Sequence, residues 1–561
     1  MRKLLIFILL ILVQNVKSQK KITEVEKSTS LCFIWGLLKY QHPEISKGKL
    51  NWNKEFIDIY DKIKNIETNE ELNNELFNWC NSFEGKTTKY LSKKINLNKV
   101  SLYTKNVDFT WIEKPSFDDN LKLRLNQIKD NTNYEDFYAS INKLNNFVEF
   151  DNEKGIEDFD FQIKSNRILF LSSFWNTMRY WNVNIYLTEE PWNDVLKNIQ
   201  SDFINADTKE KFEFAKMKLF SKLNDSHSNY ETDYFYKNIL NRFPTFGGKI
   251  INDSLVITNL FNKSLAKKDG IQIKDVIYQI ENKSLKEYFA NKFKNFGSFS
   301  NLNYSKQQNQ YYWLLASNKD SIFVKTITSN NKTETKFIKL YKFENYKSED
   351  RENLVEPKKE NYYEINSNIG YINLDQITKD ELKTAFEVNI NKKGIIIDLR
   401  NYPAVISESD LSKYLYPEKK VFVKVLSPLK PSYAQYDMQA PLKILKNPFS
   451  SGSKNSNYYK GKVVLLVNRR TLSKAEYLGM LIQQSPNCTT IGEQTGGAVM
   501  NRIQITLADK TTIDFTGMGA FYPNDIGVQR NGLKLDYEIT ENAINYNPNK
   551  YIEEAIKIIE K

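Results

Sequence analysis

The sequence predicts a multidomain α/β protein, in which a helical region precedes a small β domain and a larger α/β core. The chain has 561 residues, which is more than one hydrophobic core usually contains. Apolar residues recur with helical spacing up to about residue 240. Short alternating strand patterns follow, and continuous apolar strands alternate with helical patterns after residue 361. Hydrophobic residues make up 40% of the chain, which is enough to fill several cores and argues against disorder.

Residues 1–18, MRKLLIFILLILVQNVKS, have the pattern of a secretory signal peptide. Arg2 and Lys3 precede a run of ten apolar residues, and Val16 and Ser18 stand where a signal peptidase reads small residues before Gln19. The apolar run is too short to span a bilayer. We therefore expect an exported protein, periplasmic or secreted, without stable membrane insertion.

Residues 19–240 predict a helical domain that contains an internal repeat. Two tryptophans, a tyrosine and an asparagine of one segment recur at identical spacing in a second: Trp35, Tyr40, Trp52 and Asn53 match Trp175, Tyr180, Trp192 and Asn193. Four matches at one offset indicate a duplicated helical unit. We interpret these aromatic residues as core packing.

Residues 243–345 predict a small β domain, because alternating apolar and polar residues are interrupted there by Gly and Asn-Asp turns. Within this range, LAKKDGIQIKDVIYQIENKSL resembles a PDZ domain in its small helix, its turn and the strand that follows. Lys274 stands where that turn usually has a second Gly. The resemblance implies a sheet edge that binds an extended peptide as an added strand. The charged residues 346–360 are interpreted as a linker.

Residues 361–561 predict an α/β core. GIIIDLR (394–400) and KVVLLVN (462–468) are continuous apolar runs, typical of strands in a sheet covered on both faces. The helical pattern LSKAEYLGMLIQQ (472–484) leads to the strand CTTIGE, which makes a strand–helix–strand crossover. A hairpin is expected around Ala508 and Asp509.

Ser473 is the candidate nucleophile, because it follows a buried strand and lies in the first turn of a helix. Free backbone amides and the positive helix end gather there, and they would stabilise an oxyanion. The alternative is a helix cap, worth about 1 kcal/mol, a role that Thr471 could also fill. Taken alone, this window favours the cap.

A catalytic serine needs a base, and few residues of the chain qualify. The Lys474 side chain leaves the helix about 100° from Ser473. Glu476 stands where a Ser-x-x-Lys dyad would need an amine. The chain has two imidazoles, His42 and His227. His227 lies in the polar turn LNDSHSNY, where a lone His is usually a surface residue.

The composition argues against metal and nucleic acid. Two His and three Cys (Cys32, Cys80 and Cys488) show no spacing that suits a metal site, so we expect no metal and no cofactor. The net charge of +12 arises from 80 basic residues interleaved with 68 acidic ones, which favours a mildly basic surface over a nucleic-acid site. Whether Cys32 and Cys80 pair stays open.

Four segments of the core resemble the tail-specific (C-terminal processing) serine proteases, in the order of that family. NRRTLSKAEYLGML is similar to their nucleophile segment, in which Thr-x-Ser-x-x-Glu opens a helix. GIIIDLRNYP, IGEQTGG and FYPNDIGVQRNGLKLDYEI resemble three further motifs, so the likeness covers about residues 365–545. WGLLKYQHPE and YWNVNIYL look like the N-terminal region of a bacterial exported subgroup. The resemblance implies a crotonase/ClpP-like α/β catalytic core.

The resemblance also implies roles for individual residues. Ala498 occupies the position of the Lys that bacterial processing proteases use, whereas Ser226-His227 matches a Ser-His dipeptide of the tricorn-core branch. The resemblance to that branch implies that Ser473 is the nucleophile, His227 the base and Ser226 a supporting group. The backbone amides of Lys474 and Ala404 would form the oxyanion hole.

Two departures from the family pattern leave an alternative open. Ala404-Val405 replaces the usual Gly-Gly, and the acidic partner of the His falls around Gln529, which carries no charge; Glu476 is a second possible orienting residue. We expect a serine endopeptidase acting on extended or unfolded polypeptides. The alternative is a catalytically inactive peptide-binding scaffold of the same fold. The sequence leaves the cleavage preference and the oligomeric state open.

Overall fold

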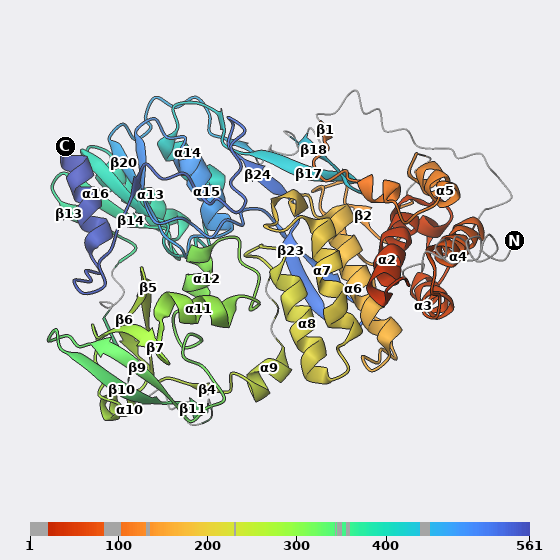
Figure 1. The fold of residues 1–561 in the computed structure, drawn as a ribbon. Coiled ribbons are helices and arrows are strands. Elements are labelled where there is room, and N and C mark those ends of the chain that lie inside the picture. Colours follow the sequence, from red (N-terminus) through yellow and green to blue (C-terminus); the bar gives the residue numbers. More distant parts are fainter. Residues whose placement is uncertain are drawn as a thin grey trace, which may run out of the picture.

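The computed structural model describes residues 21–83, 102–130, 135–228, 230, 232–342, 344, 351–354, 360–437 and 449–561. The expected signal peptide, residues 1–18, lies outside the described residues, as does most of the expected linker. Within that linker, Glu352–Asn353 form strand β12, which pairs with strand β6 (Ser254–Leu260). Figure 1 shows the N-terminal helices on one side of the molecule, the α/β core on the other, and a smaller β region below the core.

The helical region consists of two sets of three helices with the same internal spacing. The first set is α2 (Glu24–Gln41), α3 (Trp52–Ile63) and α4 (Asn69–Asn81), and the second is α6 (Lys164–Trp181), α7 (Trp192–Ile204) and α8 (Lys209–Ser221). Every helix of the second set begins 140 residues after its counterpart, and the ends keep the same offset except that α7 is one residue longer than α3. The first helices of the two sets, α2 and α6, pack against each other and are buried over most of their surface.

Paired tryptophans hold the first two helices together in each set. Trp35 Nε1 donates to Trp52 O at 3.1 Å, and Trp52 Nε1 donates back to Trp35 O at 3.3 Å. Trp175 and Trp192 repeat both bonds, at 2.8 and 3.0 Å. Each indole thereby satisfies its single donor inside the core. The matched aromatic residues are therefore structural.

The smaller β region is an antiparallel sheet with two short helices. Its strands are ordered β10 (Thr333–Lys339), β9 (Ser321–Ile327), β7 (Val276–Ile280), β6 and β12, and β5 (Phe246–Ile251) also pairs with β6. Helices α10 (Lys263–Lys268) and α11 (Leu285–Phe293) supply Ala266, Leu285 and Phe289 to its core. Helix α12 (Leu302–Asn309) follows and lies next to β5.

The C-terminal core is a six-stranded sheet covered on both faces. Its order is β13 (Tyr362–Asn366), β14 (Ile369–Asn373), β15 (Gly394–Asp398), β20 (Lys462–Val467), β21 (Cys488–Gly492) and β25 (Tyr537–Glu538). All neighbours from β14 onwards are parallel. Helices α13 (Lys379–Asn389), α14 (Glu408–Leu415) and α15 (Lys474–Ile482) cover one face, and α16 (Lys550–Glu560) covers the other.

A hairpin of the core inserts into the helical region. Strands β22 (Arg502–Thr506) and β23 (Thr512–Thr516) pair over five residues, so the hairpin expected around Ala508 and Asp509 is present. Its apolar side chains, including Ile503 and Phe515, belong to the same buried cluster as the helices. Figure 1 shows β23 running beside α8. The hairpin thus carries the core's residues into contact with the helical region.

The three cysteines are free thiols, and Cys32 and Cys80 are fully buried without bonding to each other. Burial raises the pKa of both thiols to about 12. Among the helices that the structure describes, none has the length and apolar character needed to cross a membrane.

Candidate active site

The site lies where two neighbouring parallel strands end. Strands β15 and β20 pair in parallel, so the loops that follow them emerge at the same edge of the sheet, where α/β proteins place their ligands. Thr471 joins the two loops, because its hydroxyl donates to Leu399 O at 2.9 Å and accepts from the Asn468 amide at 3.0 Å. Thr471 therefore fixes the turn that leads into α15.

Ser473 does not cap helix α15. Its backbone has φ 59° and ψ −121°, and its side chain makes no capping hydrogen bond. A positive φ in a residue with a Cβ costs about 1–3 kcal/mol, and such strain gathers at functional sites. A sharp, strained strand-to-helix turn is the geometry that presents a nucleophilic serine. Ser473 is partly exposed.

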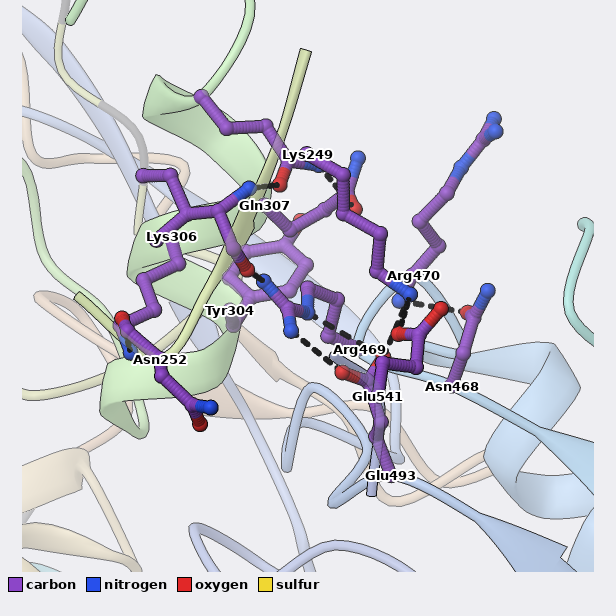
Figure 2. A network of polar contacts seen from close by, with 12 residues as sticks. Lys249, Asn252, Tyr304, Lys306, Gln307, Asn468, Arg469, Arg470, Glu493 and Glu541 are labelled. Carbon is purple, nitrogen blue, oxygen red and sulfur yellow. Dashed lines mark hydrogen bonds and ion pairs between the residues drawn. The ribbon is translucent and has the colours of Figure 1, made fainter. Parts of the chain in front are cut away.

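A buried charge network anchors the turn before Ser473 to the smaller β region (Figure 2). Arg469 forms an ion pair with Glu493 and donates from Nη1 to Ile250 O, on strand β5, at 2.8 Å. Lys249, also on β5, pairs with Glu541 and lies 3.6 Å from the Glu493 carboxylate. Two cations and two carboxylates therefore compensate one another at this junction, which buried charges require.

Glu476 holds the loop that faces Ser473. Its carboxylate is fully buried and accepts from the Thr495 hydroxyl, from Gly497 N at 2.8 Å and from Ala498 N at 3.0 Å. The same loop accepts from Ser473 N, through Ala498 O at 3.0 Å. Burial raises the pKa of Glu476 to about 7. Glu476 thus contacts the loop and not the His227 ring.

The two expected oxyanion residues lie together. Lys474 Nζ donates to Ala404 O at 2.9 Å, so the loop after β15 packs against the start of α15. The Lys474 amide donates to no acceptor in the described part of the chain. An unpaired amide at a helix N-terminus is suited to donate a hydrogen bond to a developing oxyanion.

His227 lies in the turn after α8, and it is 9% exposed. Its Nδ1 is 2.9 Å from the hydroxyl of Thr516, the last residue of the inserted hairpin. Burial lowers the pKa of His227, and Arg502 adds to this, while Asp225 and Asp514 act in the opposite direction. The imidazole is therefore neutral at neutral pH, as a general base must be.

The other expected supporting residues lie near His227 without bonding to its ring. The Ser226 hydroxyl donates to Gly496 O at 2.8 Å and accepts from Ser300 N at 2.9 Å. Gln529 Nε2 lies 3.3 Å from the Thr516 hydroxyl, so Thr516 stands between Gln529 and the imidazole. Both side chains thus belong to the surroundings of the site. His42 is buried in the helical region, where burial lowers its pKa to about 4.

Two residues that sequence reasoning did not single out contact His227. Thr516 bonds to the ring, and Asp225 accepts from the His227 amide at 3.0 Å and from the Thr516 hydroxyl at 2.7 Å. Asp225 stands two positions before His227 in the same turn, so the sequence contained a signal that the two residues lie close together. Nothing in the sequence pattern indicated Thr516, which is 291 residues away from Asp225.

A cavity of about 280 Å³ opens beside His227. Leu472, the neighbour of Ser473 in the sequence, lines this cavity together with His227. Its lining combines polar residues, such as Ser228, Thr232 and Arg502, with aromatic and apolar ones: Met217, Tyr230, Phe235, Leu240, Phe293, Phe296 and Trp313. Ser473 and His227 form no hydrogen bond to each other among the described residues, and such bonds are often long before a substrate binds.

The core matches a known family of peptidases. Residues 368–539, which include Ser473, match the family model described as peptidase family S41. This chain contains a peptidase family S41 domain. The S41 domain makes the protein a serine-type peptidase, and it spans β14 to β25. No curated protein matches the chain.

Solved structures are similar over a longer stretch than the S41 domain. The structure of mature CPAF complexed with lactacystin has a TM-score of 0.53 at 10% identity, covering 71% of this chain and 98% of that one. The photosystem II D1 C-terminal processing protease (14% identity, 70% and 97% covered, TM-score 0.37) and the tricorn protease (16%, 70% and 37%, 0.31) are also similar. The likeness to mature CPAF shows a fold shared beyond the S41 domain.

Proposed function

We propose that the protein is an exported serine endopeptidase that hydrolyses extended or unfolded polypeptides, with Ser473 as nucleophile and His227 as base. The observation that carries the proposal is the backbone of Ser473. A helix-capping serine needs neither φ 59° nor a side chain free of capping bonds, whereas a nucleophile at a strand-to-helix turn has both. The S41 domain supplies the reaction class. The backbone geometry supports Ser473 as the nucleophile.

The reaction follows the scheme of a serine acyl transfer. Ser473 Oγ attacks the scissile carbonyl while His227 takes its proton and later returns it to the leaving amine. The Lys474 and Ala404 amides stabilise the tetrahedral oxyanion. Water then attacks the acyl-enzyme, again with His227 as base. The low pKa of the buried His227 favours the neutral base that both attacks need.

The substrate class follows from the surroundings of the site. The aromatic cavity beside His227 can take a large apolar side chain of the substrate, and such side chains become accessible when a polypeptide is extended or unfolded. The β region, which we propose to be PDZ-like, offers sheet edges to which an extended peptide can add as a strand. The N-terminal segment of the sequence supports export, to the periplasm or beyond the cell.

An inactive peptide-binding scaffold is the second candidate. Ala404-Val405 in place of Gly-Gly and the uncharged Gln529 favour it. The positive φ of Ser473 favours the enzyme, because backbone strain at a strand-to-helix turn is typical of a nucleophilic serine.

Hydrolysis of a fluorogenic unfolded protein substrate tests the proposal. Ser473→Ala should abolish hydrolysis with an unchanged melting temperature, and Ser456→Ala, on the exposed surface, is the matched control. His227→Gln should reduce turnover at least about 100-fold, because general base catalysis contributes 10²–10⁴-fold. Hydrolysis by Ser473→Ala at the wild-type rate would refute the assignment.

A further inference from the structure

We propose that Asp225 is the carboxylate that positions His227, and that it acts through the hydroxyl of Thr516 instead of touching the ring. The proposal rests on the proposed function, because it assigns His227 as the base. It replaces the orienting role that the sequence left to Gln529, which has no charge to offer.

Both carboxylate oxygens of Asp225 accept hydrogen bonds from Thr516. Asp225 Oδ2 accepts from Thr516 N at 2.6 Å, and Oδ1 accepts from the Thr516 hydroxyl at 2.7 Å. Oδ1 also accepts from His227 N at 3.0 Å, and the Asp225 amide donates to Ser298 Oγ at 2.9 Å. Asp225 is 3% exposed and Thr516 is fully buried. The carboxylate therefore fixes both the backbone that carries the imidazole and the hydroxyl that contacts it.

The protons of this chain of contacts determine the tautomer of His227. A hydroxyl has one proton, and the Thr516 proton goes to the Asp225 carboxylate, which can only accept. Thr516 Oγ1 must therefore accept at His227, so the imidazole carries its proton on Nδ1 and donates it at 2.9 Å. The second lone pair of Thr516 Oγ1 faces the Gln529 amide at 3.3 Å. Nε2 is then left unprotonated, as a base that receives a serine proton must be.

The charges around the His227 ring oppose one another. Asp225 raises the pKa of His227 without touching the ring, and Asp514 on strand β23 acts in the same direction. Burial has the largest effect and lowers the pKa of His227, and Arg502, on the paired strand β22, lowers it further. The carboxylate is close enough to stabilise an imidazolium during proton transfer, yet the ring is neutral before the reaction starts.

A purely structural role is the competing explanation, because Asp225 also orders its own turn. Substitutions at Thr516 separate the two roles. Thr516→Val keeps the shape and the β-branched side chain but removes the hydroxyl, while Thr516→Ser keeps the hydroxyl. In both variants the Asp225 contact to the residue 516 amide is retained.

The first readout is the kinetics of hydrolysis. Thr516→Val should lower kcat by about 10- to 100-fold with KM little changed, because the hydroxyl orients the base and does not bind substrate. Thr516→Ser should restore most of the rate, and Asp225→Asn should resemble Thr516→Val. Wild-type kcat in Thr516→Val and Asp225→Asn, with Ser473→Ala inactive, would overturn this inference alone. Full hydrolysis by Ser473→Ala would instead overturn the proposed function.

The second readout does not depend on activity. The chain has only two His, so the full-length protein labelled with [¹⁵N]histidine gives two imidazole spin systems, and His42→Gln assigns them. The wild-type spectrum should show His227 protonated at Nδ1 and unprotonated at Nε2. Thr516→Val should shift it toward a mixture of tautomers, and Thr516→Ser should not. A His227 protonated on Nε2 in the wild type would contradict the hydroxyl bridge.

Discussion

The buried ion pair between Lys216 and Asp509 should couple the stability of the protein to its turnover. Lys216, on α8, is 3% exposed at its side chain and pairs with Asp509 at 2.8 Å and with Glu213 at 3.0 Å. Asp509 lies at the tip of the inserted hairpin, whose last residue, Thr516, contacts His227. Lys216→Met keeps the apolar stem of the side chain but removes the cation from between two buried carboxylates.

The cost follows from what the substitution leaves behind. Removing one partner of a buried pair costs about 3–5 kcal/mol, because the remaining charge is uncompensated. Glu213 keeps a second cation, Lys209, at 2.7 Å, whereas Asp509 has no other ion-pair partner among the described residues. We therefore expect a loss of about 3 kcal/mol in the free energy of unfolding. Lys197→Met, at an exposed pair with Asp194, should cost less than about 1 kcal/mol.

The loss should also depend on pH. Lys216 and Lys209 hold the pKa of Glu213 below its usual value of 4.5 against the opposite effect of burial. A lowered carboxyl pKa contributes stability that is present above the unfolded pKa and lost as pH falls through the folded pKa. Lys216→Met removes part of this contribution. The difference between variant and wild type should therefore be largest near pH 7 and shrink on acidification below pH 4.5.

Urea unfolding at several pH values, followed by tryptophan fluorescence, measures these energies, and hydrolysis measures kcat in the same samples. Adding Asp509→Asn to Lys216→Met should recover at least about 1 kcal/mol, because the uncompensated charge is gone. A loss below about 1 kcal/mol in Lys216→Met, or additive effects of the two substitutions, would refute the reasoning.

Three further outcomes are expected. Peptides with Phe or Leu next to the scissile bond should have a kcat/KM at least about tenfold higher than their Ala counterparts in a matched series. Met217→Phe should reduce this preference by filling the cavity beside His227. Equal rates across the series would contradict a role of the cavity in specificity. Gly497→Ala should lower the free energy of unfolding by at least about 1–2 kcal/mol and slow turnover, because Gly497 has φ +71° and an added Cβ would lie 2.7 Å from Arg530 O. An unchanged midpoint of urea unfolding would exclude this strain. In the pH profile, kcat/KM should decrease on the acid side only below pH 6.5, because burial lowers the pKa of His227. A decrease centred above pH 6.5 would show that another residue is the base.

The sequence was most informative where local patterns determine structure. The apolar run before Ser473 predicted strand β20 and the helical pattern predicted α15, since both follow from short-range periodicity. The recurrence of Trp35 and Trp52 at Trp175 and Trp192 reflects helices that share one spacing and one pair of indole bonds. His227 was singled out by elimination among the possible bases and by the Ser-His dipeptide of the family resemblance, and its role as base stays a prediction.

The contacts around His227 could not be derived from the sequence. Thr516 reaches the ring because a hairpin of the core inserts into the helical region, and no local pattern encodes that docking. Glu476 and Gln529 were candidates for orienting His227 because of their positions along the chain. In the structure Glu476 contacts the loop at Gly497, and Gln529 contacts Thr516. The strained φ of Ser473 likewise depends on how its two loops are held, through Thr471 and Ala498.

Labelling with a fluorophosphonate, followed by intact-mass spectrometry, tests the central claim that Ser473 is an activated nucleophile. The wild type should gain one adduct, Ser473→Ala should gain none, and His227→Gln should react far more slowly. Absence of an adduct on the wild type, or an adduct on Ser473→Ala, would contradict the claim.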